Sequence, residues 1–155
     1  MTILHTAGIS LPVPRGWEAR GRVGGALEGG GVAYPALHLA TCALTGDRAA
    51  YGGGVVERLE PDGCFLALVE FAPSSAGTAL FAERGLVRRL RAHWFAPSAL
   101  QRAIPGQLGV QRFFSEGARA LCLYVVLGGA AAIATRLAEV NDVLAHASIH
   151  AAVRA

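Results

Sequence analysis

Two apolar runs of strand length stand out along the chain, and turn residues bound each of them. In residues 65–71 the pattern predicts a strand with its odd-numbered side chains on one face. Residues 121–127 are apolar throughout, as expected of a central strand that is covered on both faces. Residues 110–114 are mostly β-branched or aromatic, and the turn residues 115–117 that follow them predict a hairpin with the central strand.

From about Ala130 the spacing of apolar residues changes to that of a helix. The apolar stripe consists of Ile133, Leu137, Val140 and Leu144, with Ala134 and Ala147 on or near it. The residues that fall away from the stripe are Arg136, Glu139, Asp142 and His146. This pattern predicts one long amphipathic helix that reaches about Ile149 and packs on the preceding strand.

The other segments predict shorter elements. Extended segments are expected at 3–5, 9–13, 17–23 and 34–44, short helical turns at 80–94, and a flexible hairpin loop at the glycine-rich stretch 24–31. Residues 55–59 fit either a helical turn or a strand, and residues 97–104 predict a helix with Ser98 as its N-cap. Because no repeat or linker interrupts the chain, we expect one α+β domain over residues 1–155, an antiparallel β-sheet packed by helices.

The composition is apolar for a chain of this length. Hydrophobic residues make up 53% and charged residues 16%, which indicates that a partner or a second subunit covers part of the surface. Residues 118–135 are too short, and too interrupted by glycine, to predict a membrane span. The first residues lack the pattern of a signal peptide, and Cys42, Cys64 and Cys122 show no pairing pattern. We therefore expect a cytoplasmic protein with buried, free thiols.

Arginine is the only strongly basic residue type in the chain, and its positions are clustered. No acidic residue lies between Arg84 and Arg112, and the arginines of this span are Arg84, Arg88, Arg89, Arg91, Arg102 and Arg112. Arginine beside an aromatic residue suits phosphate, a carboxylate or an acidic protein segment. The candidate binding residues are Arg88, Arg89, Arg91, His93, Trp94 and Arg112, and the alternative is a solvated basic face. Since the net charge of +3 is mild and no recognised motif is present, we expect no nucleic-acid partner.

Glu70 is the single charge in the apolar run 65–71. A buried carboxylate needs a partner, and arginine is the strong cation that this chain offers. Glu70 is therefore a further candidate binding residue, which would join Arg112 in a pocket between the sheet and the helices. The alternative is that Glu70 lies near the end of its strand and is solvated.

No motif for catalysis or for a cofactor occurs in the chain. The sequence lacks G-x-S-x-G and G-x-G-x-x-G, and without lysine it has neither a Walker A lysine nor a Schiff-base lysine. His146 and His150 are four residues apart in the predicted helix, and His38 and Cys42 have the same spacing, but neither pair brings a third ligand. We expect no catalytic residues, no metal and no cofactor.

The segment Pro14-Arg15-Gly16-Trp17 resembles the P-x-G-W opening of Mog1/PsbP-like domains. Those domains also end with a long antiparallel hairpin and a packed helix, as predicted for residues 110–149. The resemblance implies an α/β/α sandwich around an antiparallel sheet, in a family whose members mostly bind partner proteins or assist larger complexes. It brings no catalytic residues. Residues 111–114 and 123–128 also resemble a small actinobacterial family of unknown function.

Three functions fit these observations. The first is a non-catalytic module for protein binding or scaffolding, an accessory protein whose arginine-rich face binds a partner with acidic groups. The second is a small-ligand-binding protein or an enzyme, with its pocket between the sheet and the helices. The third is a homo-oligomeric structural component. The missing catalytic motifs place the binding module first.

Overall fold

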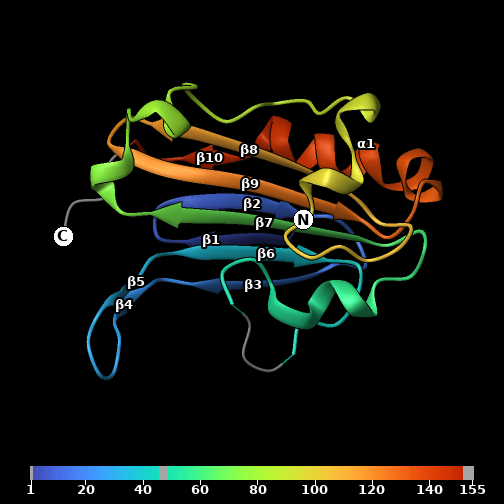
Figure 1. The fold of residues 1–155 in the computed structure, drawn as a ribbon, viewed down its shortest axis with the longest axis horizontal. Coiled ribbons are helices and arrows are strands. Elements are labelled where there is room, and N and C mark those ends of the chain that lie inside the picture. Colours follow the sequence, from blue (N-terminus) through green and yellow to red (C-terminus); the bar gives the residue numbers. More distant parts are fainter. Residues whose placement is uncertain (1, 46–48, 152–155) are drawn as a thin grey trace.

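The computed structural model describes residues 2–45 and 49–151, and its centre is a five-stranded antiparallel sheet, the main sheet (Figure 1). Its strands, in spatial order, are β3 (Glu18–Arg22), β6 (Ala36–Ala40), β7 (Cys64–Phe71), β9 (Arg119–Leu127) and β8 (Leu108–Glu116). Strand β9 lies between β7 and β8 and is buried along its whole length, so the prediction of a central strand is confirmed. The described residues form an α+β fold with antiparallel sheets and one α-helix.

A three-stranded antiparallel sheet, the small sheet, stands beside the main sheet. It consists of β1 (Thr2–Thr6), β2 (Ile9–Val13) and β10 (Ser148–Ile149), with β2 in the middle. Ala7 and Gly8 form the two-residue turn between β1 and β2, and both have positive φ, as a tight hairpin requires. Strands β4 (Gly25–Ala26) and β5 (Val32–Ala33) pair as a short ribbon that projects from the body (Figure 1).

The small sheet and the helix α1 (Ala131–His146) cover one face of the main sheet, which we call the back face. The core on this side combines side chains from all three parts, among them Leu66, Leu68, Leu121 and Leu123 of the main sheet, Ile9 and Leu11 of β2, and Val140 and Leu144 of α1. The predicted amphipathic helix is thereby confirmed. One detail is wrong, because Ala134 is exposed while Ala132 and Val143 are buried.

The opposite face, the front face, is covered by loops and short 3₁₀ helices. The longest of these is η1 (Gly53–Arg58), and the others are η2 (Pro73–Ser75), η3 (Ala79–Phe81) and η5 (Pro97–Ala99). A further 3₁₀ helix, η4 (Ala92–Trp94), lies on the back side, where Trp94 packs against the back-face core. The core under η1 consists of Ala40, Leu44, Val55, Val56, Phe65, Ala67, Val69, Tyr124 and Val126. Both faces of the main sheet are therefore buried, but by different kinds of structure.

Two predicted helices are shorter than the sequence indicates. The helix expected at 97–104 is wrong in extent, because only η5 forms; Ser98 makes no side-chain cap, and Leu100 is already extended. The backbone N–H of Ala96 donates to the oxygen of Gly109 in β8, and the oxygen of Ala96 accepts from the N–H of Gly109. This pair of bonds fixes the start of the segment against the edge of the sheet. Helix α1 ends at His146 because Ala147 is extended and the next two residues pair with β2.

The P-x-G-W segment is a structural joint between the small sheet and the helix. Trp17 is buried, and its Nε1–H donates to Oε2 of Glu139 on α1 at 3.0 Å. Arg136 donates to the other oxygen of Glu139 at 2.9 Å, and it also donates to the backbone oxygen of Asp62, before β7, at 2.8 Å. These bonds fix the position of α1 against the main sheet.

Candidate functional site

Residues 84–95 form an irregular stretch, the arginine segment, that begins and ends beside β8. The N–H of Gly85 donates to the Ser115 oxygen at 2.8 Å, and Ala96, the next residue after the segment, pairs with Gly109. Leu86, Leu90 and Phe95 anchor the segment in the back-face core. Because these apolar side chains point into the core, the charged residues between them are held at the surface.

The guanidinium of Arg88 is hydrogen-bonded within the protein, although the residue is exposed. Its Nη1 donates to the backbone oxygens of Leu144 and Ala147, at 3.1 and 2.6 Å, where α1 ends. The last carbonyls of a helix lack partners within the helix and carry partial negative charge, so a guanidinium is favoured there. Of the six arginines in the predicted cluster, this one caps the helix.

Arg112 lies against Trp94. The guanidinium carbon of Arg112 is 4.3 Å from the centre of the Trp94 ring, which is a cation–π contact. The Nε of Arg112 is buried and has no hydrogen-bond partner among the described residues. His93 is exposed, and its ring lies 6.1 Å from the Trp94 ring at a steep angle. The structure therefore brings three of the candidate residues, Arg112, Trp94 and His93, close together.

Arg89 and Arg91 are the exposed part of this arrangement. They flank the buried Leu90, whose backbone N–H and C=O both bond to the side-chain amide of Asn141 on α1, at 2.7 and 3.1 Å. No carboxylate of residues 2–45 or 49–151 pairs with either arginine. Two unpaired cations are thus presented by a segment whose own backbone is firmly held.

Arg102 lies apart from this group, because it pairs with Glu57 of η1 on the front side of the molecule. The six arginines of the span from Arg84 to Arg112 therefore make different contacts in the structure. Arg88 closes a helix, Arg102 joins two surface segments, and Arg112 lies under an indole ring. The remaining cations are Arg84, Arg89 and Arg91, which are exposed and unpaired within the described residues.

Glu70 is paired inside the molecule. Its two carboxylate oxygens accept hydrogen bonds from Nε and Nη2 of Arg119, at 3.0 and 2.5 Å. Only 11% of the Glu70 side chain and 4% of the Arg119 side chain are exposed, so the alternative of a solvated Glu70 is wrong. Arg119 also donates to the backbone oxygen of His150, at 3.2 Å, which ties the end of β7 to the chain after β10.

Sequence reasoning missed Arg119, although the sequence contains a signal for it. Arg119, Leu121 and Leu123 share one face of β9, while Glu70 and Leu68 share the same face of the neighbouring β7. Glu70 lies opposite Leu121, so Arg119 is its diagonal neighbour. Each residue is the one charge in its apolar row. Aligning the apolar faces of the two strands in the sequence would therefore have predicted an ion pair between Glu70 and Arg119.

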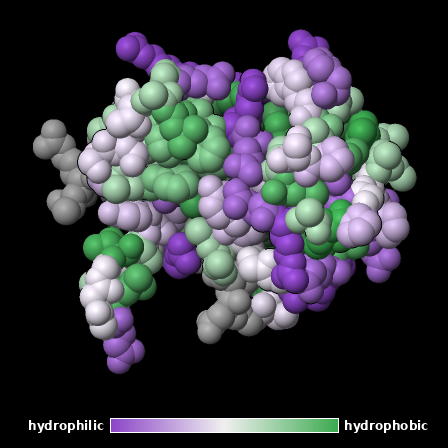
Figure 2. All heavy atoms as spheres, in the orientation of Figure 1, coloured by the Kyte–Doolittle hydropathy of each residue, from purple (hydrophilic) through white to green (hydrophobic). Residues whose placement is uncertain are grey.

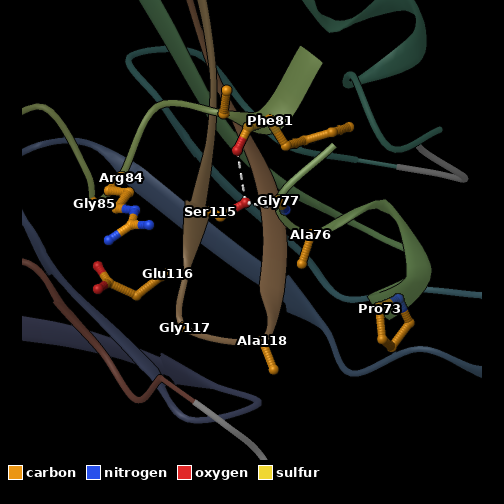
Figure 3. A pocket seen from close by; sticks show the side chains of 11 residues that line it. Pro73, Ala76, Gly77, Phe81, Arg84, Gly85, Ser115, Glu116, Gly117 and Ala118 are labelled. Carbon is orange, nitrogen blue, oxygen red and sulfur yellow. Dashed lines mark hydrogen bonds between the residues drawn. The ribbon is translucent and has the colours of Figure 1, made fainter. Parts of the chain in front are cut away.

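The described residues also form a groove of about 920 Å³ at the end of the β8–β9 hairpin (Figure 3). Small residues provide much of its lining: Ala76, Gly77, Ala82, Gly85, Gly117 and Ala118. Figure 3 shows the charged ends of Arg84 and Glu116 on the same side of the groove. The groove therefore has a backbone-rich surface with charge at one end.

Ser115, in the middle of this groove, has a structural role. Its hydroxyl donates to the Phe81 oxygen at 2.7 Å and accepts from the Gly77 N–H at 2.9 Å (Figure 3). Its backbone N–H donates to the oxygen of Glu83 at 2.8 Å. The hydroxyl proton of Ser115 is therefore donated to a backbone carbonyl, and these bonds hold residues 77–83 against β8.

Of the two pairs that contain histidine, His146 and His150 are not placed as the sequence predicted. His146 ends α1 and His150 follows β10, so they do not share a helix face, and that expectation is wrong. His38 is buried on the front face, where its Nε2 lies 2.7 Å from the oxygen of Ala50. Within residues 2–45 and 49–151, no three His, Cys, Asp or Glu side chains are grouped as a metal site would require.

No family model, no curated protein and no solved structure matches this chain. The geometry of the site is therefore the basis for inferring a function. A helix with the length and apolar character needed to cross a membrane is absent from the described part of the chain.

Proposed function

We propose that the protein is a non-catalytic binding module that recognises an acidic segment of a partner protein. The observation that supports this best is the pair Arg89 and Arg91, which are exposed and have no carboxylate partner among the described residues. The adjacent Trp94 and Arg112 add an aromatic surface and a third cation. A guanidinium binds carboxylates in a two-pronged geometry, which makes an acidic peptide the matching ligand.

The backbone beneath these cations favours binding as well. Arg88 and Leu90 are hydrogen-bonded to α1 and to Ala147 just after it, and the backbone oxygen of Arg91 accepts from the N–H of Trp94, so the backbone that carries both cations is held before a partner arrives. A preorganised surface loses less conformational entropy when it binds. This rigidity distinguishes the arginine segment from an ordinary solvated loop that carries the same charge.

The proposal can be tested with a fluorescein-labelled hexaglutamate peptide in an anisotropy titration at low salt. Arg89→Ala with Arg91→Ala should weaken binding about tenfold, since each exposed ion pair contributes up to about 1 kcal/mol. The matched control is Arg15→Ala with Arg20→Ala, which removes the same charge from exposed positions outside the segment. That control should bind the peptide almost as tightly as the unchanged protein.

Equal losses in both double variants would show that only net charge matters, and would refute a specific arginine surface. Tighter binding of a single-stranded oligothymidylate than of hexaglutamate would point to nucleic acid and would also count against the proposal. Arg88 is left unchanged in these variants, because its substitution removes the cap of α1 and would mix stability with binding.

We also propose that the protein is similar to Mog1/PsbP-like domains and that it is a bacterial, cytoplasmic accessory protein. The likeness is supported by the P-x-G-W joint and by the order of the closing hairpin and helix. A reducing compartment agrees with the free thiols of Cys42, Cys64 and Cys122. The alternative of a ligand pocket built on Glu70 and Arg112 has less support, because Arg119 occupies both carboxylate oxygens of Glu70.

A further inference from the structure

The exposed large apolar side chains of the described residues are concentrated in two places. Val23, Leu27 and Val32, which are 71%, 51% and 56% exposed, lie on or beside the β4–β5 ribbon. Leu80, which is 60% exposed, belongs to η3, and the next residue of η3, Phe81, lines the groove of Figure 3. Ile3 of β1 is the fifth such residue, at 44%. Clustered apolar surface on a projecting element is typical of an interaction site.

Residues 23–34, which we call the arm, are held at their base. Nη2 of Arg22 donates to the oxygen of Tyr34 at 3.1 Å, and a side chain on Gly24 would come within 2.6 Å of the Ala33 oxygen. The tip is closed by the N–H of Leu27, which donates to the Gly31 oxygen at 3.0 Å. A two-stranded ribbon is marginal in water without further packing, so this arm gains most when a second surface covers it.

The groove and the arm lie at the same end of the molecule. Figure 1 shows the arm projecting below the end of the main sheet at which the β8–β9 hairpin turns. In Figure 2, apolar surface is visible on the arm and again over the segment that contains η3. A second copy related by a two-fold axis at this end could therefore present its arm to the first groove and receive the first arm in its own.

The charges of the two surfaces are complementary. The tip of the arm carries Glu28, which is exposed and makes no ion pair among the described residues. The groove carries Arg84, which is also exposed and unpaired within them. Glu116 lies on the same side of the groove, but a guanidinium has five N–H donors and can bind more than one carboxylate.

We propose that the partner of the arm is a second copy of this chain. The arm of each protomer lies in the groove of the other, with Leu27 against the exposed Leu80 of η3, and with Glu28 bound to Arg84. The small residues that line the groove leave its backbone accessible to the incoming ribbon. This inference does not depend on the proposed acidic-segment binding, which uses Arg89 and Arg91.

The test is sedimentation velocity of the full chain over a wide range of protein concentration. The unchanged protein should form dimers, and Leu27→Asp should weaken the dimer at least about tenfold, because it places a charge at the centre of the buried surface. Ile3→Asp is the matched control, since Ile3 is a similarly exposed apolar residue on β1, and it should dimerise normally. Circular dichroism should show unchanged folding in both variants, because both positions are exposed.

A charge exchange tests the geometry of the contact. Glu28→Arg and Arg84→Glu should each weaken the dimer several-fold, and the two substitutions combined should restore it, because the pair is then reversed. A chain that remains monomeric at every concentration would overturn the inference. So would a Leu27→Asp variant that dimerises like the unchanged protein, or a combined variant that is no tighter than either single one.

Discussion

Both faces of the main sheet bury apolar side chains, but they are covered in different ways. On the back face, α1 spans 16 residues and packs with the small sheet into one continuous core. On the front face, η1 spans 6 residues and η5 only 3, and irregular chain fills the space between them. The back cover contains a regular amphipathic helix, next to the irregular arginine segment and the small sheet, whereas no α-helix covers the front face among the described residues.

The front cover is held instead by individual polar side chains. The hydroxyl of Tyr124, which rises from β9, accepts from the N–H of Gln101 at 2.7 Å. The side-chain amide of Gln111 on β8 donates to Ala99 at 2.7 Å, and that of Gln107 donates to Val56 at 2.8 Å. Each bond satisfies a backbone group that a helix or strand would have satisfied by itself. We therefore expect the back cover to unfold with the whole domain and the front cover to open locally.

The largest expected effect concerns the ion pair at the edge of the back face. Arg119→Met would leave the carboxylate of Glu70 buried without a partner, and this should lower the free energy of unfolding by about 3–5 kcal/mol. Urea denaturation measures the change. The matched control is Arg136→Met, which removes a more exposed arginine of α1 and should cost about 1 kcal/mol.

A variant in which both partners are replaced distinguishes the effect of the ion pair on stability from the effect of the side-chain packing around it. Glu70→Met together with Arg119→Met should recover most of the lost stability, because no uncompensated charge remains. If the double variant were as unstable as Arg119→Met alone, the hydrogen bond from Arg119 to His150, and not its pairing with Glu70, would explain the loss.

The next effect compares the two covers with the same substitution. Leu144→Ala empties a fully buried site under α1 and should cost about 2–5 kcal/mol. Leu100→Ala, next to η5 on the front face, removes a partly buried side chain and should cost less than about 2 kcal/mol. Thermal and urea unfolding of the two variants test the order. Equal losses would show that the front cover is as tightly integrated as the back.

The same difference explains how far the sequence allowed the structure to be predicted. The central strands of the main sheet and the helix on its back face have clear patterns, so their positions follow from residues 65–71, from the continuous apolar run 121–127 and from the helical spacing in residues 130–149. The front cover has no period. Its η5 segment was predicted as a helix at 97–104, because nothing local shows that Ala96 is bound to β8 or that the hydroxyl of Tyr124 holds Gln101.

The candidate site divides in a similar way. The sequence indicated that arginines gather near His93 and Trp94, and the contact between Arg112 and Trp94 agrees with it. It could not show which arginines remain free. The role of Arg88 depends on where the arginine segment crosses the end of α1, and this crossing is decided by the tertiary fold alone.

The smallest expected effect is a difference in the rate of alkylation between two thiols that lie on opposite faces of the main sheet. Cys64 is buried in the back-face core, and Cys122 is buried under the front cover, near Tyr51. Burial raises the pKa of the Cys122 thiol to about 11, against an ordinary value of 9.0, and it raises the pKa of Cys64 as well. At neutral pH both thiols are therefore protonated and slow to react until their cover opens.

If the front cover opens locally as expected, iodoacetamide should label Cys122 faster than Cys64, and the half-buried Cys42 should react first. Mass spectrometry of peptides over a time course measures the three rates. The pH dependence has a definite sign: the unfolded thiols ionise at lower pH than the folded ones. The contribution of these two thiols to stability should therefore be complete well below about pH 9 and be lost as the pH rises above it. Equal rates for Cys64 and Cys122, both matching global unfolding, would mean that the two faces open together and that their covers do not differ in stability.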